Sequence, residues 1–282
     1  MPTPPLVYAF QSDEKIRDGF VRILGEISVC GRDLTLRSRK PMGELIHEGR
    51  LLIKRVRALI WFARPVLDSA VHARARTRLR KAAGLLADQR DLEVTQATLE
   101  KLAQKASIDA RDWAALVRTF RSLVCDSAAG GAPRKALRQL LQKAMGILSR
   151  SVAEIKRSVA GRAAWPSPSD RVAEAFRATR EAGKKARRSG KDVDFHEWRK
   201  RAKRLLYQLE LSQVEPGKRK ARVIKRVAKL QDKLGAYHDS VVVESRLRQM
   251  IPLTSSSRRV LRLLEKRKAL LRKRAEKIAR RM

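Results

Sequence analysis

Residues 47–55 of the chain read HEGRLLIKR, and 149 positions later residues 196–204 read HEWRKRAKR. Five of the nine positions are identical and follow the pattern His-Glu-x-Arg-x-x-x-Lys-Arg. A second pair of segments has nearly the same separation, since residues 86–91 read LADQRD and residues 234–239 read LGAYHD. Two matches in the same order and at nearly one spacing predict an internal duplication of the chain.

The sequence around these segments predicts an all-α fold. Apolar residues recur at three- and four-residue spacing through stretches that are rich in Ala, Leu, Arg, Lys and Glu. The clearest predicted helices are Glu14–Ile27, Gly43–Arg64, Val71–Ala87 and Asp109–Val124. A segment with two prolines, Trp165–Ser169, lies near the middle of the 282 residues and predicts a boundary. We therefore expect two pseudo-symmetric helical bundles, formed by residues 1–164 and 165–282.

The first repeated segment places a row of basic residues on one side of its helix. The row consists of His47, Arg50, Lys54 and Arg57. Spacings of three, four and three residues keep these side chains within a sector of about 80°. The second repeat has the equivalent row His196, Arg199, Lys203 and Tyr207. Aligned cations repel one another along a helix, and a bound row of phosphates would offset that repulsion. A solvated helix surface is the alternative for either row alone.

Two further predicted helices carry basic rows without a histidine. These rows are Arg74, Arg78 and Lys81, and Arg222, Lys225, Arg226, Lys229 and Lys233. The chain has 66 Lys and Arg against 29 Asp and Glu, which gives a formal net charge of +37. Such a charge favours a polyanion as the partner. Only 5% of the residues are aromatic, which weighs against single-stranded nucleic acid because its bases usually stack on aromatic rings.

No residue set for catalysis or metal binding is evident. A zinc-protease helix needs a second histidine four residues after the first, where this chain has Leu51 and Lys200. Neither a phosphate-binding glycine loop nor a pair of carboxylates for acid–base work is found. Cys30 and Cys125 favour reduced thiols in a cytosol. The longest apolar run, Ala58–Ala63, is too short for a membrane span. We therefore expect a cytoplasmic protein without a signal peptide, enzymatic activity, cofactor or metal.

Together these motifs resemble the CHAD family, the conserved histidine α-helical domain, from about residue 8 to the end of the chain. In that family a helix begins with His, has Arg three residues on and then a Lys/Arg cluster. A Leu-Gly-x-x-Arg/His-Asp segment follows downstream, and the first copy here departs from it by having Ala87 in place of glycine. The opening Tyr8-Ala9-Phe10 is also similar to the family's N-terminus. The family pattern adds four residues to the candidate site, namely Arg55, Arg90, Arg204 and His238.

The resemblance implies two bundles around a basic central cavity or groove that binds inorganic polyphosphate, with targeting to polyphosphate granules. It implies a binding module and not an enzyme, because the chain has no room for the triphosphate-tunnel domain that some family members carry. Nonspecific binding of DNA or RNA through charge alone is the alternative function. An enzyme acting on polyphosphate is a third, for which the sequence lacks the carboxylates that would hold Mg²⁺.

Overall fold

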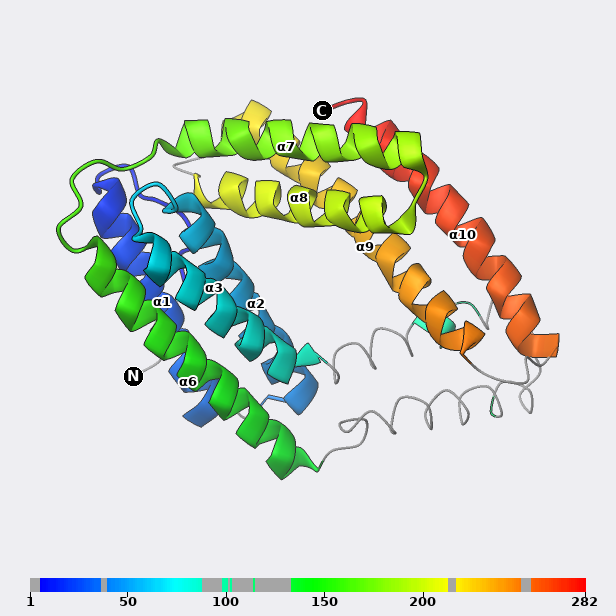
Figure 1. The fold of residues 1–282 in the computed structure, drawn as a ribbon, viewed down its shortest axis with the longest axis horizontal. Helices are drawn as coiled ribbons and strands as arrows, with labels where there is room; N and C mark the ends of the chain where they lie inside the picture. The colour runs from blue at the N-terminus through cyan, green and yellow to red at the C-terminus, as the bar shows by residue number, and fades with distance from the viewer. Residues whose placement is uncertain are drawn as a thin grey trace. The chain divides into compact units, whose positions relative to one another are not determined.

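The computed structural model describes residues 6–36, 40–87, 98–100, 102, 114, 133–212, 217–249 and 255–282. Helices are the only regular secondary structure within these residues, so the predicted all-α class is confirmed. The helices whose bounds are described (Figure 1) are α1 (Ile16–Leu36), α2 (Met42–Phe62), α3 (Ser69–Leu85), α6 (Arg134–Val159), α7 (Pro168–Ser189), α8 (Asp192–Leu211), α9 (Lys218–Arg248) and α10 (Ser255–Ala279).

The first three helices follow the periodicity of the sequence. Both ends of α2 and α3 lie within two residues of the predicted bounds. α1 continues to Leu36, beyond its predicted end, because Gly31 and Leu34 extend its buried side. α3 begins at a side-chain cap, in which the Asp68 carboxylate accepts hydrogen bonds of 2.9 and 3.0 Å from the backbone N–H groups of Ala70 and Val71. The predicted helix Asp109–Val124 lies outside the described residues.

The chain forms two compact units, and each is assembled from separate stretches of sequence. Unit 1 consists of Met1–Arg90, Ala132–Ala175 and Arg204–Lys220, and unit 2 consists of Asp91–Gly131, Phe176–Lys203 and Ala221–Met282. Each unit therefore combines stretches from both sides of residue 165. The division into repeats at 1–164 and 165–282, and the pseudo-symmetry between them, stay predictions.

Unit 1 is built on α6, which packs against α1, α2 and α3 (Figure 1). Its core contains fully buried side chains from these helices, such as Phe20, Ile53 and Val56. The N-terminal segment completes this core, since the Phe10 N–H donates a 3.0 Å hydrogen bond to the Leu211 carbonyl at the end of α8. Burial of this apolar surface is the main source of stability for the unit.

Unit 2 has an aromatic core at the start of α8. The Phe195 ring lies 5.9 Å from that of Trp198 and 4.8 Å from that of Tyr237 on α9. The turn between α7 and α8 uses Gly190, whose φ of +65° favours glycine. The Arg272 guanidinium of α10 donates to the Gly190 carbonyl and so ties this turn to the last helix.

Candidate functional site

The predicted row on α2 occupies the accessible side of that helix. His47 and Arg57 are exposed, and Arg50 and Lys54 are partly exposed. The opposite side of the helix is buried in the core of unit 1, as Ile53 and Val56 show. The spacing of three and four residues therefore predicted correctly which side chains of α2 reach the surface.

In each unit the arginine of the His-headed motif contacts the segment that carries the second repeated motif, which begins at Leu86 in one copy and at Leu234 in the other. In unit 1 the Arg50 guanidinium donates a 2.6 Å hydrogen bond to the carbonyl of Leu86, directly after α3. In unit 2 Arg199 lies against α9 at Gly235, where an added Cβ would be 3.9 Å from Arg199 Nε. Leu86 and Gly235 belong to the two copies of the second motif, so each pair of motifs is brought together locally.

A cluster of three arginines extends the α2 row onto α3. Desolvation lowers the pKa of the Arg57 guanidinium, and the nearby Arg80 and Arg76 guanidiniums lower it further. Arg76 and Arg80 are exposed, and none of the three forms an ion pair with a residue in the described part of the chain. The sequence reading missed Arg76 and Arg80, although their i, i+4 spacing on a predicted helix was a visible signal.

In unit 2 the predicted residues His196 and His238 form a pair. Their Nδ1 atoms are 3.2 Å apart and their ring centroids 4.5 Å apart. Burial is the main cause that lowers the pKa of His238 to about 4, and Arg199, His196 and Lys200 lower it further. Burial also lowers the pKa of His196, with Lys200 and Arg199 adding to the effect and Glu197 opposing it. Both rings are therefore neutral near pH 7, in a strongly positive environment.

Arg199 lies beside this histidine pair and lowers the pKa of both rings. Its Nε atom is buried and has no hydrogen-bond partner among the described residues. An unsatisfied buried donor is costly, and an acceptor that reaches it contributes a charge-assisted hydrogen bond. Lys203, the next residue of the row on α8, is partly exposed. Phosphate oxygens are acceptors suited to such a set of N–H donors.

Several predicted site residues pack within unit 1 instead of forming an open basic surface. Tyr207 is 9% exposed, its ring lies 6.1 Å from that of Tyr8, and burial raises its pKa to about 12. Arg55 lies over the Tyr8 ring at 5.2 Å, and Arg204 lies over the Trp61 ring at 5.0 Å. These contacts give the three residues a packing role through aromatic and cation–π interactions.

The basic row on α3 divides between two environments. Arg78 forms an ion pair with Glu154 of α6, and Arg74 contacts the same carboxylate at 2.8 Å. These contacts lower the pKa of Glu154, because both guanidiniums favour its charged form. Lys81 is exposed. Arg90, the last basic residue predicted for this half, lies outside the described residues.

The basic row on α9 does not share a helix face with His238. Arg222, Lys225, Arg226 and Lys229 are exposed, and Lys233 is partly exposed. Nine residues separate Lys229 from His238, a rotation of about 180° around the helix. The Arg226 guanidinium donates a 2.8 Å hydrogen bond to the carbonyl of Arg281, beyond the end of α10. On α9, therefore, the row and the histidine pair form separate surfaces.

The described ranges contain neither a cluster of metal-binding side chains nor a helix suited to a membrane span. No group of three or more His, Cys, Asp or Glu side chains there is placed to hold a metal ion. The helices of those ranges also include none long and apolar enough to cross a membrane. Cys30 is a free thiol whose pKa is raised, mainly by burial.

Comparison with known proteins identifies the family to which these motifs belong. The family model described as the CHAD domain matches residues 30–248, which include both His-headed segments. The chain belongs to the CHAD domain family. A crystal structure of the CHAD domain from the plant Ricinus communis has the same fold, with a TM-score of 0.73 and 18% sequence identity over 97% of this chain and 94% of that one. No curated protein sequence matches the chain.

The histidine pair predicts that this CHAD domain loses stability in mild acid. An unfolded histidine has a pKa of about 6.5. Below that pH the two histidines are therefore protonated more fully in the unfolded chain than in the folded protein, where the pKa of His196 and that of His238 are lowered. Because the pKa of His238 stays lowered to about 4, the free energy of unfolding should fall by up to about 1.4 kcal/mol per pH unit for that residue between these values. Urea denaturation at pH 7, 6 and 5 measures the slope.

The same denaturation series is measured for the double variant His196→Gln/His238→Gln, and its dependence of unfolding free energy on pH is compared with that of the wild type. Carboxylates elsewhere titrate in both proteins, so the difference between the two slopes isolates the histidine pair. We expect the variant to show the shallower dependence on pH. Identical slopes for the two proteins would show that neither histidine is shielded from protonation.

Proposed function

We propose that the chain binds inorganic polyphosphate through the His-headed surfaces of its two units. In unit 1 this surface comprises the row on α2, from His47 to Arg57, together with Arg76 and Arg80. In unit 2 it comprises His196, Arg199, Lys203 and His238. The observation that carries the proposal is the cluster Arg57–Arg76–Arg80, in which each guanidinium has other cations as neighbours and no ion-pair partner in the described residues. Such a cluster is stabilised when an anion binds.

The chemistry of polyphosphate fits these surfaces better than that of nucleic acid. Polyphosphate has a charge on every small unit and no bases, so its recognition needs only cations at a suitable spacing. Two aromatic residues near the rows, Tyr207 and Tyr237, are buried in the cores and offer no stacking platform for bases. Membership in the CHAD family, which is linked to polyphosphate in general, supports the same partner.

The proposed role is binding without turnover, together with localisation to polyphosphate granules. Binding needs no metal site and no acid–base pair, only charge-assisted contacts to successive phosphates. A protein that holds a long polymer through several such contacts will accumulate wherever that polymer is concentrated. Localisation is tested by imaging the fluorescently tagged protein in cells with and without polyphosphate synthesis.

Long-chain polyphosphate should displace a bound fluorescent polyphosphate probe more effectively than RNA or duplex DNA at equal phosphate concentration. The competition is measured by fluorescence anisotropy at physiological salt. Binding should weaken steeply with salt, because each neutralised phosphate releases roughly 0.7–0.9 of a counterion in the comparable case of nucleic acids. Equal or better displacement by mixed-sequence RNA would favour the nonspecific nucleic-acid function instead.

A further inference from the structure

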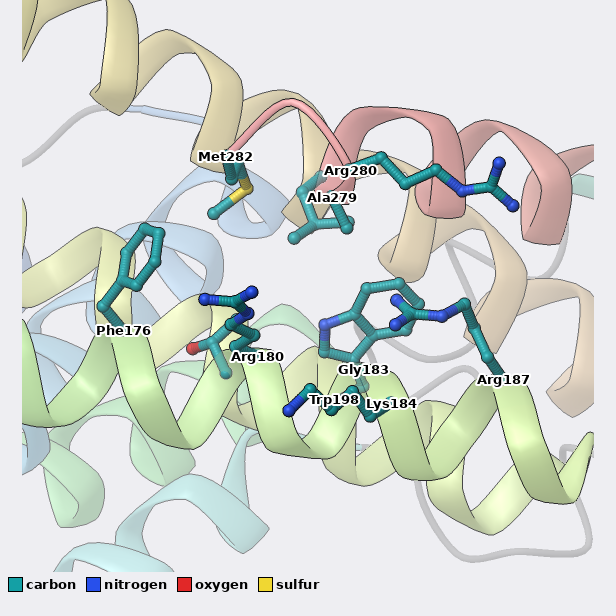
Figure 2. Close-up of a pocket in the computed structure, with 11 residues that line it drawn as sticks. Phe176, Arg180, Gly183, Lys184, Arg187, Trp198, Ala279, Arg280 and Met282 are labelled. Carbon is teal, nitrogen blue, oxygen red and sulfur yellow. The ribbon is translucent and has the colours of Figure 1, made fainter.

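Unit 2 contains a pocket that belongs to neither basic surface described above. Its cavity volume is about 320 Å³, within the lower range of small-molecule sites. Figure 2 shows its walls, which come from α7, from Trp198 of α8, and from the last residue of α10 and the residues that follow it. Leu230 of α9 also lines the pocket. The apolar part of the wall includes Phe176, Trp198, Leu230 and Met282. A mixed aromatic and aliphatic wall of this kind suits an organic ligand.

A glycine shapes the wall of the pocket beside Trp198. A Cβ on Gly183 would lie 2.9 Å from Trp198 Cε2 and 3.0 Å from Trp198 Nε1, closer than side chains approach. The missing side chain therefore lets the indole pack directly against α7. Figure 2 shows the indole nitrogen on the side of the ring toward Arg180. This N–H is a donor that an acceptor inside the pocket would satisfy.

The open edge of the pocket is strongly cationic. Arg180, Lys184 and Arg187 follow one side of α7 at i, i+4 and i+7, and Arg280 adds a fourth charge. Lys184 pairs with Glu181 at 2.8 Å, whereas the three arginines form no ion pair with the described residues. None of the lining side chains is a carboxylate. Four cations around one opening match a ligand that carries more than one negative charge.

The pocket is also separate from the histidine pair. Trp198 follows His196 by two residues, which turns its side chain by about 200° around α8. Trp198 is 1% exposed and packs toward α7, whereas His196 meets His238 of α9. A ligand in the pocket and a polymer on the His-headed surface therefore contact different sides of α8.

We propose that this pocket binds a nucleoside phosphate. An inorganic polyanion would leave the aromatic and aliphatic wall without a partner, and an uncharged aromatic molecule would leave the three arginines of the edge without an anion. An alkyl chain would leave the indole N–H unsatisfied, whereas a nucleobase supplies both a flat ring and acceptor atoms. The ring lies against Phe176, which is partly exposed, with its acceptor atoms toward the indole N–H of Trp198, and the phosphates bind the arginines of the edge through charge-assisted hydrogen bonds.

The proposal is tested by isothermal titration calorimetry of the full chain with ATP, tripolyphosphate and adenosine, without Mg²⁺ and at physiological salt. ATP should bind at least about tenfold more tightly than adenosine, because adenosine lacks the phosphates. Phe176→Ala should weaken ATP by about fivefold or more, because it removes a stacking surface, and should leave tripolyphosphate unchanged. Arg180→Gln/Arg280→Gln should weaken ATP by about tenfold or more.

Arg177→Gln/Arg188→Gln is the matched control, because both arginines are exposed on α7 and neither lines the pocket. It removes the same charge and should leave ATP binding nearly unchanged. The edge variant alters only exposed side chains, so it remains informative should Phe176→Ala fail to fold. No binding of ATP, or ATP binding that responds equally to the edge variant and the control, would overturn the proposal.

The test also separates this pocket from the proposed polyphosphate surface. The titrations are repeated in a variant that lacks Arg50, Lys54, Arg199 and Lys203, and ATP affinity should be the same as in the wild type. Polyphosphate binding by the pocket variants is measured in parallel and should stay within about twofold of wild type, since screened surface charges contribute little. Loss of ATP binding in the surface variant would place the nucleotide on the His-headed surface and not in the pocket.

Discussion

Replacing Arg50, Lys54, Arg199 and Lys203 together by glutamine should weaken polyphosphate binding by about a hundredfold or more. Each lost charge-assisted phosphate contact is expected to cost about 1–3 kcal/mol, against a few tenths for a screened surface charge. The variant removes only four of the 66 Lys and Arg residues, so the field of the whole protein changes little. Affinity is measured directly by fluorescence anisotropy at physiological salt.

The control for this variant removes the same number of charges of the same types from α10. Arg262, Lys273, Arg274 and Lys277 are exposed on that helix and supply two arginines and two lysines. Arg272 is unsuitable for a control, because its guanidinium binds the Gly190 carbonyl and supports the turn between α7 and α8. The control should lose only a few-fold in affinity. Equal losses in the two variants, with both folded by circular dichroism, would mean that binding depends on total charge and not on the His-headed surfaces.

Trp198→Ala should lower the free energy of unfolding by about 3–5 kcal/mol. The indole is 1% exposed, packs against Gly183 and lies beside Phe195 in the aromatic core of unit 2. Its removal deletes a large buried apolar surface and leaves a cavity that the surrounding helices fill only in part. Chemical denaturation measures the loss.

Gly183→Ala perturbs the contact between Trp198 and α7 from the α7 side. The added methyl group would lie 2.9 Å from the indole, so overpacking should cost about 1–3 kcal/mol. In a Trp198→Phe background the cost should be smaller, because the phenyl ring lacks part of the indole surface that the methyl group meets. Gly84→Ala is the control, since nothing lies within 4 Å of its added methyl group and alanine favours a helix. A cost for Gly183→Ala that is the same in both backgrounds would show that the indole is not its cause.

The sequence by itself determined the helical class of the fold and the accessible side of α2. Both are local properties, because the helical period of 3.6 residues per turn assigns each side chain to a face of its own helix. The same periodicity placed His196, Arg199 and Lys203 together on α8. By the same periodicity, His238 and Lys229 lie on opposite sides of α9.

Only the tertiary structure decided which charges remain open to a ligand. Arg78 resembles Arg80 in the sequence, yet Arg78 pairs with Glu154 of α6, 76 positions away, while Arg80 adds to the field at Arg57. Tyr207 belongs to the predicted row on α8 but packs against Tyr8 in the core of unit 1. The partners of these side chains come from other helices, and helix periodicity specifies a face without specifying what packs against it. For the same reason, the meeting of His196 with His238 and the pocket beside Gly183 followed from the packing of helices and not from any single segment.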